Sequence, residues 1–215
     1  MFILPMPGET SRFIRDYCGI GGVIDYQIVG LEDESDLKRA THAAAARLSI
    51  EEIARTLGSN PNWGAGAAIS IDHDKKITGC RITTQDFVGS HFDLIRKKAI
   101  LRGHTKNHLN DFFYTDDEET PNNAFGGPTM SAGYSYAFFE PPYRLGGSNE
   151  QKESLFRGIN RQLFDEFEKP MMIYSWSTDW SSYFDAGNEW WGSFLWTAHV
   201  IGTKQIVVVA AAASD

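Results

Sequence analysis

The chain of 215 residues is 42% hydrophobic and 13% aromatic, which is enough apolar material for a folded core and excludes intrinsic disorder. Its net charge of -8 opposes binding to phosphate backbones, so we expect no nucleic-acid partner. It has no run of about 18 apolar residues and no secretion signal at its N-terminus, so we expect a cytoplasmic protein that does not associate with membranes.

The first predicted elements are two consecutive helices. Apolar residues recur at helical spacing over 37–48, after an acidic run that suits a helix N-terminus. Ser49 and Glu52 then match a capping box, and Gly58 is placed as a C-terminal stop. Residues 49–58 also resemble the first helix and turn of a helix-turn-helix DNA reader. No recognition helix follows Gly58, and the acidic charge argues against DNA binding.

A β-hairpin is predicted next, followed by a basic helix. Residues 67–71 and 76–83 are typical of strands and flank the turn-forming residues 72–75. The basic helix is predicted over 92–102, ending near Gly103, and carries the densest group of lysines and arginines in the chain. We interpret that group as a solvated helix face.

Residues 115–149 are predicted to be an irregular insertion. Prolines and paired glycines interrupt regular structure there, except over 134–139, where the alternation is typical of a strand. Aromatic residues persist on both sides of the insertion and need a shared core. We therefore expect one globular domain over residues 1–215 and no domain boundary.

A long helix over about 149–168 has the strongest signals in the chain. Ser148 and Gln151 match a capping box, and Pro170 ends the run. Its apolar stripe, which we expect to pack on a sheet, consists of Leu155, Ile159, Leu163 and Phe167.

Strands are predicted after this helix. They span 191–200 and 205–212, joined by the short connection 201–204, and residues 171–177 are a further candidate. The order of elements predicts an α+β fold in which helices pack on a mainly antiparallel sheet and a long C-terminal helix precedes a β-hairpin.

Motifs of known chemistry are absent from the sequence. His104 and His108 have the spacing of a helical metal pair, but no acidic residue lies between them as in zinc proteases, so no metal is expected. The glycines of 19–22 lack the spaced third glycine of a dinucleotide loop, and neither Gly-Lys-Ser/Thr nor Gly-x-Ser-x-Gly occurs, so no cofactor is expected. Cys18 and Cys80 are expected to be unpaired thiols in a reducing compartment.

One segment, residues 174–196, has an unusual composition. It holds nine aromatic residues in 23, including five of the six tryptophans, and no lysine or arginine occurs between Lys169 and Lys204. Its carboxylates therefore lack local partners. The candidate binding residues in this segment are Asp179, Trp180, Tyr183, Asp185, Glu189 and Trp190.

Three interpretations of the tryptophan-rich segment stay open. The tryptophans can be core residues, with 179–188 as a long turn between strands. They can be anchors of a protein-binding surface on which the carboxylates select a basic partner. They can also line a carbohydrate or small-molecule pocket, where aromatic faces stack on the ligand and two carboxylates act as acid and base.

The second interpretation gives the predicted function. We expect a non-enzymatic cytosolic binding protein, an antitoxin or immunity protein that neutralises a basic toxin or nuclease through an acidic and aromatic surface. This expectation depends on the class of chain, which is small, acidic and free of catalytic motifs. The alternative is an enzyme or binding module for a carbohydrate or similar polar molecule.

Overall fold

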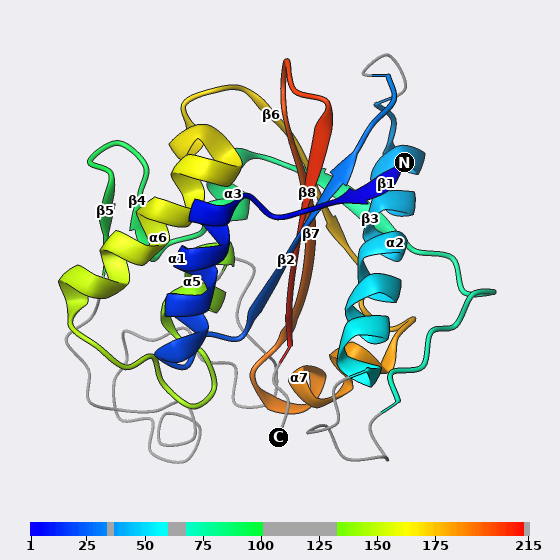
Figure 1. Ribbon diagram of the computed structural model, residues 1–215, viewed down its shortest axis with the longest axis horizontal. Helices are drawn as coiled ribbons and strands as arrows, with labels where there is room; N and C mark the ends of the chain where they lie inside the picture. Colours follow the sequence, from blue (N-terminus) through cyan, green and yellow to red (C-terminus); the bar gives the residue numbers. More distant parts are fainter. Residues whose placement is uncertain (34–36, 60–67, 101–132, 213–215) are drawn as a thin grey trace.

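Six strands form one sheet in which every neighbouring pair is antiparallel (Figure 1). The computed structural model describes residues 1–33, 37–59, 68–100 and 133–212, with the side chains of Glu189 and Trp190 left out. Across the sheet the strands are β1 (Phe2–Leu4), β2 (Ile24–Gly30), β8 (Gln205–Ala212), β7 (Ser193–Val200), β6 (Met171–Trp176) and β3 (Gly79–Ile82).

Helices cover both faces of the sheet (Figure 1). One face carries α1 (Gly8–Gly19), α3 (Thr84–Val88), α5 (Gly133–Phe139) and α6 (Asn149–Phe164). The other carries α2 (Arg39–Gly58) and the 3-10 helix η3 (Ser182–Phe184), and α7 (Asp185–Trp190) lies at one end of the sheet beside β7 and β8. The predicted α+β fold with a C-terminal hairpin is therefore confirmed.

Strand β8 shows why the sheet can serve two cores. Val207 and Val209 point into the cluster under α6, whereas Ile206 and Val208 point into the cluster under α2. Because both faces are covered, the strand is apolar at nearly every position and does not alternate with polar residues. The hairpin to β7 closes through Gly202, whose φ of 90° belongs to the left-handed region that glycine adopts without strain.

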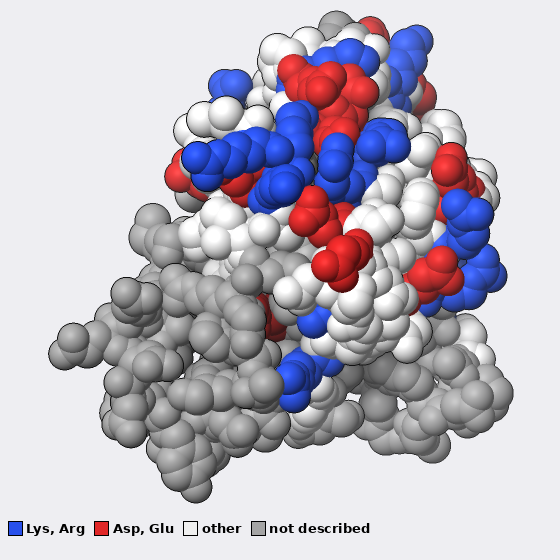
Figure 2. All heavy atoms as spheres, turned by 90° about the vertical axis from the view of Figure 1, so that its left-hand side faces the viewer, with Lys and Arg blue, Asp and Glu red and all other residues white. Residues whose placement is uncertain are grey.

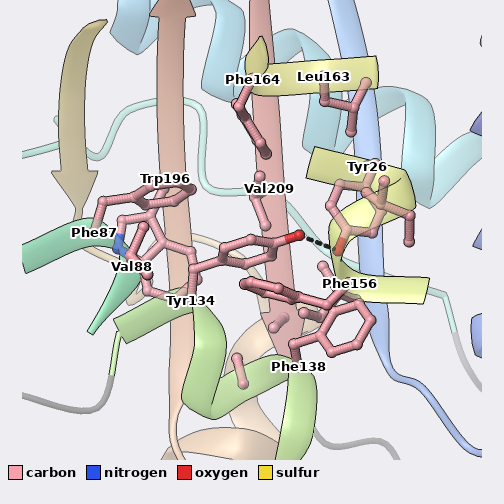
Figure 3. Packing of buried hydrophobic residues seen from close by; sticks show 14 of the residues in the cluster. Tyr26, Phe87, Val88, Tyr134, Phe138, Phe156, Leu163, Phe164, Trp196 and Val209 are labelled. Carbon is pink, nitrogen blue, oxygen red and sulfur yellow. Dashed lines mark hydrogen bonds between the residues drawn. The ribbon is translucent and has the colours of Figure 1, made fainter. Parts of the chain in front are cut away.

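The core under α6 is an aromatic cluster (Figure 3). The ring of Tyr134 on α5 stacks on Phe87 at 5.1 Å and on Phe156 at 5.3 Å between ring centres. Its hydroxyl is 2.8 Å from that of Tyr26 on β2, so two buried phenols satisfy each other. Leu163 of α6 lies in this cluster at 2% exposure, as its place in the apolar stripe predicts.

Helix α6 has the predicted start. The Ser148 side chain accepts a hydrogen bond from the backbone N–H of Gln151 at 3.2 Å. The α-helix ends at Phe164, because Asp165 adopts the left-handed conformation, and a 3-10 turn, η2 (Asp165–Phe167), completes the run.

One continuous helix, α2, replaces the two predicted helices over 37–48 and 49–58. Ser49 is fully buried in its middle and cannot act as a cap. The apolar stripe that packs on the sheet continues through this position from Ala46 to Ile50, and tertiary burial overrides the local capping signal.

Three further sequence predictions are wrong. The basic helix over 92–102 is, in its described part, a two-stranded ribbon of β4 (Phe92–Asp93) and β5 (Lys98–Ala99). Asp93 Oδ1 accepts hydrogen bonds from the N–H groups of Ile95 and Arg96, both at 2.9 Å, and this aspartate-stabilised turn competes with helix formation.

The predicted hairpin between 67–71 and 76–83 does not form. Strand β3 instead pairs with β6, with Cys80 opposite Ser175, and Ile71 makes an isolated bridge to Ser181. The predicted strand over 134–139 is the buried helix α5, because a short apolar run does not distinguish a buried helix from a buried strand.

Several predictions lie outside the described residues, including those on His104, His108 and most of the insertion over 115–149. Cys18 and Cys80 are both free and exposed. Among the described helices, none is long and apolar enough to cross a membrane.

Candidate functional site

The tryptophan-rich segment runs from β6 through η3 and α7 into β7, and its four described tryptophans are buried. Each of three indole N–H groups has an acceptor: Trp176 donates to Thr197 Oγ1 at 2.9 Å, Trp180 to the Ser177 carbonyl at 2.7 Å and Trp191 to the Glu140 carbonyl at 2.7 Å. These satisfied, buried rings belong to the core.

Trp180 is held in place by α2. Only 1% of its surface is exposed, and the guanidinium carbon of Arg47 lies 5.1 Å from its ring centre. Arg47 also donates to the carbonyls of Asp72 at 3.2 Å and Lys75 at 2.8 Å. In this conformation Trp180 has no free face for a partner, and it instead anchors the neighbouring loops.

Asp179 lies on the surface beside this anchor. Its side chain is 61% exposed, and its Oδ2 is 2.8 Å from Lys75 Nζ, which also donates to the Asp179 carbonyl at 2.9 Å. The hydrogen bond from Lys75 lowers the pKa of Asp179. The group is thus an ionised carboxylate at neutral pH.

The turn that follows Ile71 places two more carboxylates, Asp72 and Asp74, on the segment next to Asp179. The N–H of Asp72 donates to the Trp180 carbonyl at 2.9 Å, and Asp72 Oδ1 accepts from the N–H groups of Asp74 and Lys75. Thr178 Oγ1, at 3.5 Å from Asn188 Oδ1, links the same region to α7. We call the exposed carboxylates on these adjoining segments the acidic rim: Asp72, Asp74, Asp179 and Asp185.

Tyr183 is the candidate whose side chain is hydrogen-bonded to the sheet. Its hydroxyl donates to Asp25 Oδ2 at 2.7 Å and ties η3 to strand β2. Burial raises the pKa of Asp25, and the hydrogen bond from Tyr183 partly opposes that rise. The pattern of the sequence did not single out Asp25, because its partner comes from a distant part of the chain.

A second buried polar group lies between α2 and the sheet. His42 Nδ1 is 2.7 Å from Thr197 Oγ1, and the His42 ring lies 4.8 Å from that of Tyr174. Burial, followed by the proximity of His199, lowers the pKa of His42 to about 4. The imidazole is therefore neutral at physiological pH, enclosed and without access to a substrate.

The six predicted site residues thus divide into three groups. Asp179 and Asp185 are exposed, Trp180 and Tyr183 take part in packing and hydrogen bonding, and Glu189 and Trp190 lie in α7 with side chains outside the described part. Within the described residues, no group of three or more His, Cys, Asp or Glu side chains is placed to hold a metal ion.

No family model, curated protein or solved structure matches this chain. The arrangement of the site is therefore the basis for a functional assignment. Exposed, ionised carboxylates on a fixed scaffold attract cationic groups but do not donate protons at neutral pH.

Proposed function

We propose that this protein is a non-enzymatic binding protein whose acidic rim captures a basic protein, as an antitoxin or immunity protein captures a basic toxin or nuclease. The observation that supports the proposal is the exposure of Asp179 and Asp185 beside a loop that is anchored by the buried Trp180. Carboxylates at the edge of an interface steer a cationic partner and speed its capture.

The fixed geometry of the rim favours binding. Backbone hydrogen bonds join Asp72 to Trp180 and Ser182 to Ser70, so the two loops that carry the carboxylates hold each other. Because these loops are already ordered, little conformational entropy is lost when a partner binds. An arginine of the partner would compete with Lys75 for Asp179, since guanidinium groups bind carboxylates through two parallel hydrogen bonds.

A carbohydrate-binding or glycosidase function has less support. Sugar stacking needs exposed aromatic faces, whereas Trp176, Trp180, Trp191 and Trp196 are at most 5% exposed. A general acid at neutral pH needs a raised pKa, whereas the pKa of Asp179 is lowered. The described part of the segment therefore fits charge recognition better than acid catalysis.

The test compares the wild type with the variant Asp179→Asn/Asp185→Asn as immobilised bait for a lysate of the native cells. We expect the wild type to retain a basic protein that elutes as salt rises, because salt screens exposed charges. The purified partner should then bind the variant about tenfold more weakly, mainly through a lower association rate.

The matched control is Glu153→Gln/Glu168→Gln, which removes two acids from the α6 side of the molecule. On that side acidic and basic side chains are interspersed (Figure 2), and Glu168 pairs with Lys97. The control should bind like the wild type. A partner that binds the rim variant and the wild type equally well, or a partner without excess positive charge, would contradict the proposal.

A further inference from the structure

Helices α1 and α6 lie side by side on the face of the sheet opposite α2 (Figure 1), and a groove lies between them. The two helices run antiparallel: Glu9 near the start of α1 accepts a hydrogen bond from Gln162 near the end of α6. The groove is therefore formed by the C-terminal half of α1 and the first turns of α6. Its volume of about 580 Å³ is in the range of small-molecule sites.

The base of the groove is apolar. Phe13 and Ile20 of α1 and Leu155 of α6 line it and pack against the aromatic core. Phe13 approaches α6 closely because position 158 is glycine: a Cβ there would lie 2.8 Å from the Phe13 ring. The absence of that side chain lets α1 hold the ring against α6, and the guanidinium carbon of Arg12 lies 5.2 Å from the centre of the same ring.

The wall formed by α1 is cationic. Arg12 and Arg15 are exposed and line the groove, and among the described residues no carboxylate lies within ion-pair distance of either guanidinium. On α6, by contrast, Arg157 and Arg161 both pair with Glu166. Asp16 is the single acid of the lining, so the side chains that line the groove carry a net positive charge in a protein of net charge -8.

The opposite wall adds to this preference. Helix α6 begins at Asn149, so the positive end of its dipole lies near Gln151 and Ser154 in the lining. Both side chains are polar and uncharged and can hydrogen-bond an anion. The two walls and the base together define a site that is cationic at its rim and apolar below.

We propose that this groove binds a small molecule made of an apolar body and an oxyanion, either a phosphate or a carboxylate. The apolar body packs on Phe13, Ile20 and Leu155. The oxyanion lies between Arg12 and Arg15, whose guanidinium groups donate paired hydrogen bonds to such a group. This site is separate from the acidic rim and does not depend on the function proposed for it.

Calorimetric titration with four probes tests the site: phenyl phosphate, benzoate, inorganic phosphate and benzyl alcohol. We expect phenyl phosphate or benzoate to bind more tightly than inorganic phosphate and benzyl alcohol, because only these two probes engage both walls and base. Whichever of the two binds more tightly identifies the oxyanion. Failure of both to bind at millimolar concentration would overturn the proposal.

Variants locate the binding. Arg12→Gln/Arg15→Gln should weaken the preferred probe by about tenfold or more, and Ser154→Glu should weaken it through repulsion from a carboxylate inside the groove. The control Arg39→Gln/Arg81→Gln removes two exposed arginines elsewhere and should bind like the wild type. Equal loss in the control, or no loss in either groove variant while melting temperatures are unchanged, would place the ligand elsewhere and refute the site.

Discussion

His42 shows how one buried side chain makes the fold sensitive to acid. It lies on α2 and is fully buried against the sheet, its Nδ1 is hydrogen-bonded to Thr197, and its Nε2 has no hydrogen-bond partner within the described structure. Protonation would therefore place a positive charge beside His199 in an enclosed site. The groups that shift the pKa of His42 include no carboxylate that would stabilise this charge. The free energy of unfolding is therefore highest while the His42 ring is neutral.

This burial predicts a specific loss of stability in mild acid. The pKa of His42 is about 4 in the folded protein and about 6.5 in an unfolded chain, so the unfolded state takes up the proton first as pH falls. The contribution of His42 to stability is complete above pH 6.5 and declines by about 3 kcal/mol between pH 7 and pH 4. Urea denaturation at several pH values measures this decline.

The comparison that isolates His42 uses two variants. His42→Gln should lose less stability than the wild type over the same pH range, although it is less stable at pH 7 because it disturbs the bond to Thr197. His73→Gln removes an exposed histidine that lies 3.6 Å from Glu51, and it should change the pH dependence much less than His42→Gln does, because exposed ion pairs contribute little to stability. If His42→Gln and the wild type lose the same free energy between pH 7 and pH 4, the neutral buried histidine is not the cause.

At the scale of elements, α6 carries the most direct prediction. Leu163 is 2% exposed and lies in the aromatic core, so Leu163→Ala should create a cavity that costs on the order of 2 to 5 kcal/mol. Ser154, on the same helix, is exposed, and Ser154→Ala should change stability by less than about 0.5 kcal/mol. Chemical denaturation of both variants tests this, and similar costs for the two would show that α6 does not pack as described.

The elements that the sequence predicted correctly are those with independent local signals. Helix α6 combines a capping serine, an apolar stripe and a terminating proline, β6 is a largely apolar run after that proline, and β7 and β8 are apolar runs joined by a short turn. Elements with a single signal were misassigned. Ser49 and Glu52 matched a capping box inside α2, and the apolar run of α5 alternated by chance like a strand.

The N-terminal elements β1, α1 and β2 were not assigned from the sequence, although β2 lies inside the sheet. Helix α1 starts after Pro7 without a side-chain capping bond, so it lacks the usual start signal. Strand β2 is defined by its pairing with β8, where Tyr26 lies opposite Val209 from the far end of the chain. Such long-range pairing leaves no local pattern to read.

The candidate site was predictable only in part, because local composition can be seen in the sequence and tertiary contacts cannot. The sequence singled out Asp179 and Asp185 as candidates because their segment contains no basic residue, but it left open whether they are exposed, as the structure has them. The burial of Trp180 does not follow, because it depends on Arg47 reaching over from α2. A cluster of tryptophans in the sequence indicates a core or an interface equally well, and only the tertiary contacts distinguish them.

At the scale of the whole molecule, one sheet joins the aromatic cluster under α6 to the smaller cluster under α2. Neighbouring residues of β2, β7 and β8 alternate between the two clusters. If these strands separate, both clusters are therefore exposed to water. We therefore expect the two clusters to unfold together, which is the behaviour that the single domain predicted from the sequence requires.

Hydrogen exchange followed by mass spectrometry tests this coupling. Leu163→Ala weakens only the cluster under α6, yet it should shift the denaturant midpoint for exchange of α2 amides by as much as that for α6 amides, because both need the intact sheet. Ala46→Gly, on the α2 side, should shift both midpoints in the same way. If each variant instead accelerated exchange only in the helix on its own side, the two faces would be separate cooperative units. Helix α2 could then unfold while α6 and the sheet stayed folded.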